Sequence, residues 1–535
     1  MTLPNAADLL RRLEELNRIG VSLSKEKDID RLLEAILLAA KTIAGADGGT
    51  LYRVQDGKLH FKILRNDTLN IAMGGTTGVP IPFEPLSMYD EQGRPNNSMV
   101  VAHAVLHDVT VNIPDAYSAE GFDFSGTRQF DKKTGYRSQS FLTVPMKDHE
   151  EQIIGVLQLI NAKHPVSGEI VPFAEADQRL AESLASQAAI ALTNRMLINQ
   201  LEVLFESFIN LINAAIDDKS PYTGGHCARV PVLTMMLAEA VNKTSVGPLR
   251  DFRMSAADFY ELKIAGLLHD CGKVTTPVHV VDKATKLQTI YDRIHLIDTR
   301  FEVVKRDAEI AMLRNEAADG EGSRRRCREV MEQISSDREF LRACNIGSEK
   351  MDEDEVQRVH TIAGRYRWRN ERGEEVPFLS EDEVKNLTIR SGTLTPEERQ
   401  IINHHIDVTI QMLEALPWPK HLKNVPEYAG GHHERMDGKG YPRGLTREQM
   451  SVQARIMGIA DIFEALTARD RPYKKGKTLT EALHILGKFK LNGHIDPDLF
   501  DVLIREKVYL NYGHHFLEAE QVDEVDERAI PGYVP

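Results

Sequence analysis

A long run of helix-forming residues near the middle of the chain constrains the fold more than any other feature. Residues 173–217 contain no proline, and apolar side chains such as Leu184, Leu204 and Leu211 recur in this run at helical spacing. A helix of ~40 residues extends for about 60 Å, which is longer than an ordinary globular helix. We therefore expect a connecting helix over residues 175–215, paired as a parallel coiled coil in a homodimer. Two shorter helices separated by a break are the alternative.

The residues that precede this run predict an α+β domain. Residues 8–45 have the apolar period of an amphipathic helix. Residues 51–61 then alternate between apolar and polar around an Asp-Gly pair, which is a strong hairpin signal. Residues 140–146 and 153–161 predict a second pair of strands. Helix, sheet and helix in this order predict an antiparallel sheet with flanking helices over residues 10–190.

The residues that follow the run predict an all-α domain over residues 205–515, with turns marked by proline and glycine. Residues 280–390 differ from the rest because they carry dense charge, including three consecutive arginines at 324–326. We interpret them as a helical insertion with solvated faces. The acidic tail at 519–535 is expected to be poorly ordered.

The composition excludes several classes of protein. A net charge of −14 argues against binding of nucleic acid polymers, whereas a small anionic ligand is compatible if metal ions supply positive charge. Four scattered cysteines are too few for a disulfide framework, so we expect a cytoplasmic protein. We expect no signal peptide, and because no apolar run approaches the ~20 residues that cross a bilayer, we expect no membrane partner.

Histidines and carboxylates interrupt the apolar helices of the C-terminal half. A His-Asp pair follows the apolar residues 264–268, and a His-His-Glu string precedes a Gly-Tyr-Pro turn. A buried carboxylate needs a cation or a hydrogen-bond donor beside it. Imidazole and carboxylate ligands suit iron, manganese, zinc or nickel better than calcium or magnesium. The candidate metal ligands are His226, His269, Asp270, His405, His432, His433 and Asp461.

These residue types also suggest the chemistry of the site. Two metal ions can clamp both oxygens of an in-line phosphoryl displacement. Asp270 follows a histidine and could bridge two such ions through its two oxygens. Lys273 lies one helical turn beyond Asp270 and could neutralise the charge of a phosphate.

The order and spacing of these motifs resemble the HD-GYP family of the HD phosphohydrolase superfamily. The resemblance rests on His269-Asp270 with Gly272-Lys273, on His432-His433-Glu434 and on Gly440-Tyr441-Pro442, and it covers residues 205–280 and 390–515. The family hydrolyses the bacterial second messenger cyclic di-GMP to pGpG, and in some members to GMP. It uses two or three metal ions, often iron or manganese, on an all-helical core. The resemblance implies the same activity for this chain.

The resemblance also implies a role for each matched residue. The seven candidate ligands would hold the metal ions, with Asp270 as the bridge, and Asp270 and Lys273 would be the catalytic residues. Trinuclear members carry a glutamate where this chain has Tyr222, so we expect two divalent ions, iron or manganese. The residues that would contact cyclic di-GMP are Lys273, Tyr441, Arg471 and Lys474.

The N-terminal half resembles a GAF domain through residues 155–161 and 184–192. Part of a motif from the cyclic-nucleotide-binding members recurs in this chain, as Asn161, Lys163, Phe173 and Asp177. The match is incomplete, because Ala162 separates the first two residues. We therefore favour a domain that dimerises or senses another small molecule, of unknown identity, over one that binds a cyclic nucleotide.

Two alternatives to cyclic di-GMP hydrolysis remain open at this point. One is a receptor that holds the dinucleotide without cleaving it. The other is a phosphodiesterase for a different cyclic dinucleotide. Cys227 and Cys271 adjoin candidate ligands, and we interpret both as small buried hydrophobic residues.

Overall fold

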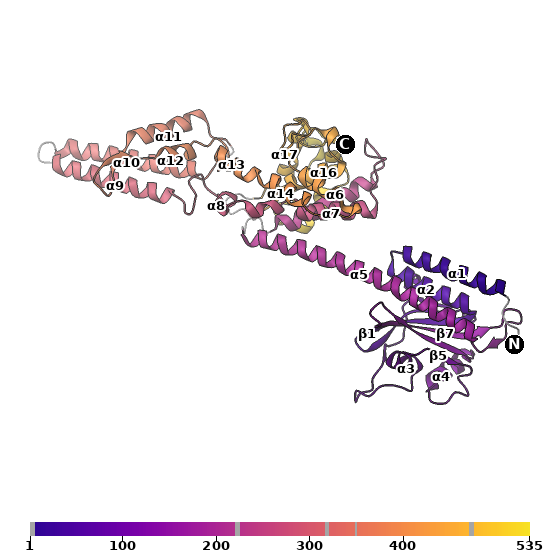
Figure 1. Cartoon of the computed structure of the whole chain (residues 1–535). Coiled ribbons are helices and arrows are strands. Elements are labelled where there is room, and N and C mark those ends of the chain that lie inside the picture. Colours follow the sequence, from indigo (N-terminus) through magenta and orange to yellow (C-terminus); the bar gives the residue numbers. More distant parts are fainter. Residues whose placement is uncertain (1–5, 220–224, 316–319, 348–349, 470–475, 535) are drawn as a thin grey trace. The chain divides into compact units, whose positions relative to one another are not determined.

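The computed structural model describes residues 6–219, 225–315, 320–347, 350–469 and 476–534. These residues divide into two compact units, Met1–Leu204 and Phe205–Pro535. Each unit has its own hydrophobic core. The predicted multidomain organisation is therefore confirmed (Figure 1).

An antiparallel sheet forms the centre of the first unit. Its strands are β1 (Ala46–Gln55), β2 (Lys58–Asn66), β3 (Ile71–Gly74), β4 (Leu86–Ser87), β5 (Val111–Ile113), β6 (Phe141–Lys147), β7 (Ile153–Lys163) and β8 (Ile170–Val171). The order across the sheet is β3-β2-β1-β7-β6-β5, with β4 beside β2 and β8 beside β7. The predicted hairpin joins β1 and β2 at Asp56 and Gly57, which both have positive φ. The second predicted pair, β6 and β7, is also present and antiparallel.

Helices cover both faces of this sheet (Figure 1). The helices α1 (Ala6–Lys25), α2 (Ile29–Ala44) and the first part of α5 (Glu175–Lys219) share one core with Leu51 and Leu157 of the sheet. The helix α3 (Val100–His107) packs against Tyr52 and Val156, which point to the opposite face, and α4 (Ser125–Thr134) lies on that side as well. Two helices replace the single amphipathic pattern predicted over 8–45, because the side chain of Asp28 accepts a hydrogen bond from Arg31 N and caps α2.

The connecting helix is continuous. The helix α5 runs from Glu175 to Lys219 without a break, so the alternative of two shorter helices is wrong. Its first part contributes Leu184 and Ala188 to the core of the first unit, and its last part contributes Ile209 and Ile216 to the core of the second.

The second unit is built from helices, as predicted. Its main core joins α6 (His226–Lys243), α7 (Ala256–Leu268), α14 (His405–Glu414), α15 (Val425–Gly430), α16 (Val452–Thr467), α17 (Leu479–Leu491), α18 (Pro497–Arg505) and α19 (Val508–Phe516). The C-terminal tail is ordered, contrary to expectation. Ile530 and Tyr533 are buried in this core, and Gln521 donates a hydrogen bond to Thr467 O, so a few apolar side chains hold the acidic tail in place.

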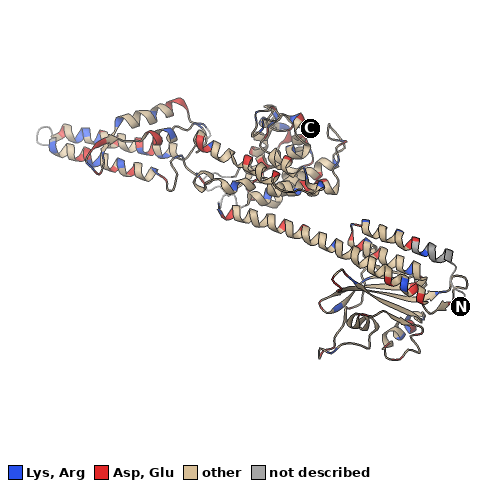
Figure 2. Cartoon of the chain, viewed as in Figure 1, with Lys and Arg blue, Asp and Glu red and all other residues tan. Residues whose placement is uncertain are grey.

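The charged insertion has a small core of its own. It comprises α9 (Ile294–Asn315), α10 (Gly320–Asn345), α11 (Glu353–Arg365) and α12 (Glu381–Leu387), together with a short hairpin of β9 (Arg367–Arg369) and β10 (Glu375–Pro377) that the sequence did not predict. Phe301, Ile334 and Phe378 are fully buried there. Residues of both charges occur along α9, α10 and α11 (Figure 2). Two short helices, α8 (Val278–Val281) and α13 (Pro396–Asn403), lie where the insertion leaves and rejoins the unit.

No helix among the described residues is both long enough and apolar enough to cross a membrane.

Candidate metal centre

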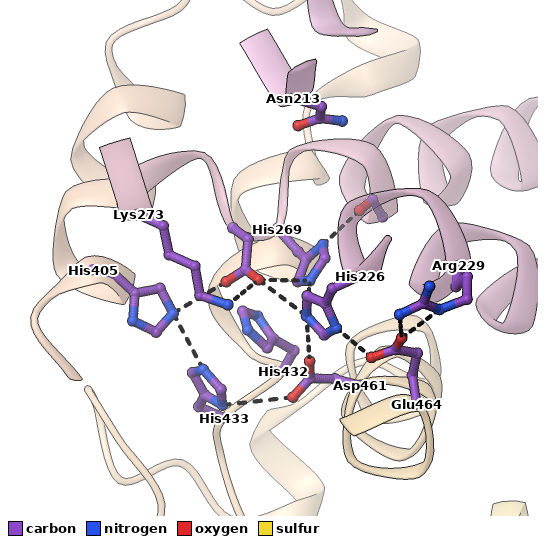
Figure 3. A network of polar contacts seen from close by, with 12 residues as sticks. Asn213, His226, Arg229, His269, Lys273, His405, His432, His433, Asp461 and Glu464 are labelled. Carbon is purple, nitrogen blue, oxygen red and sulfur yellow. Dashed lines mark hydrogen bonds and ion pairs between the residues drawn. The ribbon is translucent and has the colours of Figure 1, made fainter. Parts of the chain in front are cut away.

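Helix ends position six of the seven candidate ligands, and the cluster is drawn in Figure 3. His226 begins α6, His269 and Asp270 follow the last residue of α7, and His405 begins α14. His432 and His433 come directly after α15, whereas Asp461 lies inside α16. Three overlapping groups have ligand atoms within 4.8 Å of one another and could each hold a metal ion. These groups are His405-His432-His433, His226-His269-Asp461 and His269-Asp270-His432.

Three of the histidines are oriented in the same way. The Nδ1 atoms of His269, His405 and His432 donate to the carbonyl oxygen three residues earlier, at 2.7, 2.5 and 2.6 Å. A carbonyl oxygen can only accept, so Nδ1 carries the proton and the neutral ring leaves a lone pair on Nε2. In each case Nε2 is the atom that faces the centre of the site, which is the arrangement of a metal-binding histidine.

Asp270 lies at the centre of the cluster and is 2% exposed. Its Oδ2 atom is 3.1 Å from His226 Nε2 and 3.2 Å from His269 Nε2, and its Oδ1 atom is 3.2 Å from His405 Nε2. Burial alone would raise the pKa of this carboxyl, but Lys273 and His269 hold it well below its usual range. A carboxylate therefore faces histidines on both of its oxygens, as a bridging ligand would.

His226 and Asp461 complete one side of the site. His226 Nε2 is 3.2 Å from Asp461 Oδ1, and His226 Nδ1 donates to Glu464 Oε2 at 2.5 Å. Burial favours the neutral ring, yet the contacts with Asp270, Asp461 and Glu464 raise the pKa of His226 well above its usual value. Arg229 donates in turn to Glu464, with its Nε atom at 2.7 Å. The sequence did not predict the way in which Glu464 and Arg229 hold His226.

His432 and His433 form the other side. Burial lowers the pKa of His432 to about 4. The pKa of His433 is also well below its usual value, because this ring is buried and lies beside His432. The ring of Tyr441 stacks on His433 with centroids 4.8 Å apart. Both histidines are therefore neutral at pH 7 and able to ligate a metal ion.

The unsatisfied atoms of the cluster fit a bound cation. Nε2 of His432 and Oδ1 of Asp270 are buried and have no hydrogen-bond partner among the described residues. His405 Nε2 faces this Asp270 oxygen, and it lies 3.3 Å from His433 Nε2. Since His405 carries its proton on Nδ1, lone pairs face each other across these short distances. Cations between these atoms would remove the repulsion, so the residues fit metal ions.

Lys273 lies beside the bridge candidate. Its Nζ atom is 2.5 Å from Asp270 Oδ2, and its side chain is 19% exposed. Burial would lower the pKa of Lys273, but the charge of Asp270 raises it, so the side chain remains a cation. Lys273 and Tyr441 are the two predicted substrate contacts that lie directly against the ligand cluster in the described part of the chain.

Two close approaches fix the backbone around the site. A side chain at Gly272 would place its Cβ atom 2.0 Å from His405 O, so only glycine lets this turn pack on α14. Gly272 N also donates to Thr409 Oγ1. Glu434 accepts hydrogen bonds from Arg443 N and Leu445 N, and so closes the loop that carries Tyr441.

Several predicted residues lie outside the described structure or apart from the cluster. Arg471, Lys474 and Tyr222 are outside the described residues. His404 is 62% exposed and pairs with Asp407. Cys227 and Cys271 are both buried, and Cys271 belongs to the main core, where burial raises its pKa to about 11 and keeps it a thiol.

Comparison with known proteins identifies the domains. Residues 28–192 match the GAF domain family, and residues 380–499 match the HD domain family. The chain contains a GAF domain and an HD domain. The range matched to the HD domain includes His405, His432, His433 and Asp461. His226, His269 and Asp270 precede the insertion in the sequence, and the fold returns them to the same site.

Curated relatives share short stretches with this chain. The 3'3'-cGAMP-specific phosphodiesterase 1 of Vibrio cholerae is 46% identical over 81 residues, which are 15% of this chain and 19% of that protein. The cyclic di-GMP phosphodiesterase PA4108 of Pseudomonas aeruginosa is 37% identical over 116 residues, 22% and 27% of the two chains. The cyclic di-GMP phosphodiesterase of Thermotoga maritima is 41% identical over 96 residues, 18% and 26% of the two chains. Each alignment spans less than a third of the relative's length.

The GAF domain has a cavity of about 700 Å³ on the α3 side of its sheet. Aromatic rings line much of it, including Tyr52, Phe61, Phe83 and Phe141. Among the described residues that line the cavity, Arg65 is the one cation, and it is held by Glu34 at 2.6 Å and by two backbone carbonyls.

The residues that match the cyclic-nucleotide motif hold the GAF domain together and do not line this cavity. Lys163 pairs with the fully buried Asp47, and Asp177 pairs with Arg12. The side chain of Asn161 donates to Tyr136 Oη and accepts from Gln139 N. Phe173 is buried in the core beneath the sheet. The motif therefore has a structural explanation that involves no nucleotide.

Proposed function

We propose that this chain is a metal-dependent phosphodiesterase of the HD-GYP type that hydrolyses cyclic di-GMP, with pGpG or GMP as the end product. The observation that carries the proposal is the convergence of seven imidazole and carboxylate groups, Asp270 among them, with the ammonium of Lys273 at 2.5 Å from Asp270 Oδ2. The names of the relatives in Pseudomonas aeruginosa and Thermotoga maritima support the choice of substrate. The test is the formation of pGpG or GMP by metal-loaded protein.

Each residue has a defined task in this proposal. The seven candidate ligands, with Asp270 at their centre, would hold two divalent ions, iron or manganese. Such ions supply Lewis-acid activation of water and stabilise negative charge at phosphorus. Lys273 orients the scissile phosphate by its charge, and Tyr441 forms a wall beside His433. Arg471 and Lys474 bind the phosphates or bases of the dinucleotide. Four free thiols support a cytoplasmic location.

A second candidate substrate is a hybrid cyclic dinucleotide. The relative in Vibrio cholerae is named as specific for 3'3'-cGAMP, and it shares 46% identity over its aligned stretch. A competition assay that offers both dinucleotides to the enzyme distinguishes the two substrates by their kcat/KM ratio. A receptor that does not cleave would bind either dinucleotide and yield no linear product.

The proposed homodimer has a defined contact surface on α5. Ile190, Leu197, Leu204 and Leu211 are spaced by seven residues, and Leu201 and Phe208 lie between them at the complementary positions of a heptad. All six side chains are between 43% and 64% exposed. Much of this part of α5 carries no charge (Figure 2). Asn194 takes the heptad position of Leu201 and Phe208, and a single asparagine there specifies register in two-stranded coiled coils.

Leu204→Asp is expected to convert this dimer to a monomer, because a charge would be buried in the seam of the coiled coil. Val203→Asp is the matched control. Val203 is 66% exposed but lies outside the heptad seam, so this variant should remain a dimer. Sedimentation equilibrium on both variants measures the outcome. A dimeric Leu204→Asp variant would exclude the seam as the contact surface.

The chemistry of the GAF cavity favours an uncharged aromatic ligand. The aromatic side chains that line the cavity can stack on the rings of a ligand. Arg65, the one cation among the described lining residues, is already paired with Glu34. We expect adenosine to bind more tightly than cyclic AMP, which has the same ring and a phosphate, by roughly tenfold or more because the phosphate would be desolvated without a cation. Calorimetry with the two compounds measures the ratio. Tighter binding of cyclic AMP would refute the assignment.

A further inference from the structure

The last turns of α5 contact the segment that carries the catalytic residues. This segment, residues 267–274, joins the end of α7 to the turn of Lys273. Ile209 and Ile216 of α5 are buried in the main core of the second unit. Asn213 lies on the same face of the helix and is only 8% exposed. The side-chain amide of Asn213 is therefore buried between two apolar side chains of the same helix face.

Asn213 is bound to the first residue of the segment. Its Nδ2 atom donates to Leu267 O at 2.8 Å (Asn213 is labelled in Figure 3). Leu267 O belongs to the last turn of α7, where carbonyl oxygens have no partner within the helix. The preceding carbonyl, that of Gly266, accepts the hydrogen bond that orients His269. Asn213 therefore holds the peptide next to the one that orients a candidate metal ligand.

Lys219 is bound to the other end of the segment. Its Nζ atom donates to Val274 O at 2.5 Å and to Lys273 O at 3.4 Å. An ion pair between Glu206 of α5 and Lys263 of α7 adds a more exposed contact. A single helix thus contacts both ends of the segment that carries His269, Asp270 and Lys273.

We infer that Asn213 and Lys219 are positioning residues, through which α5 sets the geometry of the catalytic segment. An apolar side chain at position 213 could be buried equally well, but apolar packing would not fix the position of α5 along its axis. A hydrogen bond has a direction and does fix that position. The same helix is embedded in the core of the GAF domain through Leu184 and Ala188. A change in the GAF domain that rotates or shifts α5 would therefore move Leu267 O and Val274 O. The catalytic part of this inference rests on the proposed function.

The test compares Asn213→Leu with Asn210→Leu in the full-length chain. Both variants introduce the same side chain into the same helix, and Asn210 is exposed. Hydrogen exchange of peptides that cover residues 267–274 reports the contact without any substrate. Loss of one buried hydrogen bond is expected to speed this exchange roughly tenfold in Asn213→Leu alone. Lys219→Met, which changes a partly exposed side chain and opens no cavity, should speed exchange at the Val274 end.

Kinetics on cyclic di-GMP supply the second readout. For Asn213→Leu we expect kcat to fall about tenfold with little change in KM, as for other residues that orient ligands. If Asn213→Leu had the same hydrogen-exchange rate and the same kcat as Asn210→Leu, the inference would be overturned. If Asn213→Leu does not fold, unchanged exchange in Lys219→Met would overturn it as well. Absence of turnover in the unsubstituted chain would contradict the proposed function instead, and the exchange experiment would still decide the role of α5.

Discussion

Asp270→Asn is expected to lower the turnover of cyclic di-GMP by roughly 10²–10³-fold or more, the effect of losing a central preorganised charged group. The carboxylate faces His226 and His269 on one oxygen and His405 on the other. An asparagine keeps the shape but has one oxygen and no charge, so it cannot bridge two cations. The number of metal ions bound per chain should fall below two in the same sample. Initial rates and metal analysis measure the two effects.

Asp407→Asn is the matched control for this substitution. Asp407 lies on α14 near the site, but it is 45% exposed and pairs with the surface residue His404. Exposed ion pairs of this kind contribute little to stability. Metal content and turnover should therefore equal those of the unsubstituted chain. Full metal occupancy in Asp270→Asn would show that this carboxylate is not a metal ligand.

Lys273→Met is expected to lower kcat/KM by about 10²-fold while leaving the metal content intact. The ammonium is the cation that lies closest to Asp270 in the described part of the site, and it is partly exposed to an incoming phosphate. Methionine keeps most of the apolar stem and removes only the charge. The combination of intact metal binding with slow turnover separates this role from that of the ligands.

Lys243→Met is the corresponding control, because Lys243 is 76% exposed at the end of α6. Its substitution should change neither quantity. If Lys273→Met turned over cyclic di-GMP at the unsubstituted rate, the phosphate would have to be held by other residues, such as Arg471 and Lys474. A loss of metal ions in Lys273→Met would instead mean that the lysine supports Asp270 and not the substrate.

Much of the fold could be predicted because its signals are local. The Asp-Gly pair at 56–57 marks the hairpin, and the proline-free run over 173–217 marks α5. The segments whose structure differs from the prediction depend on contacts that the sequence pattern does not show. The acidic tail is ordered because Ile530 and Tyr533 fill the core, and the break before Ile29 depends on the cap formed by Asp28. Composition alone does not contain such information.

The members of the candidate site were also recognisable from the sequence, but their supporting contacts were not. His269 and His432 stand in short motifs, and the structure brings them together. The hydrogen bonds from their Nδ1 atoms to backbone carbonyls depend on where a helix ends. Glu434 shows the same limit, since its partners are backbone amides of a loop whose path no motif describes. Asn213 has no motif at all, and only its burial on α5 reveals it.

The most direct test of the proposed function is a titration of metal-free protein with iron or manganese, in which bound metal and product are measured in the same samples. We predict that the rate of pGpG or GMP formation rises with bound metal and levels off at two ions per chain, and that Asp270→Asn shows no such rise. A chain that binds two ions and cyclic di-GMP but forms no more product than Asp270→Asn would contradict the proposal and identify the protein as a receptor.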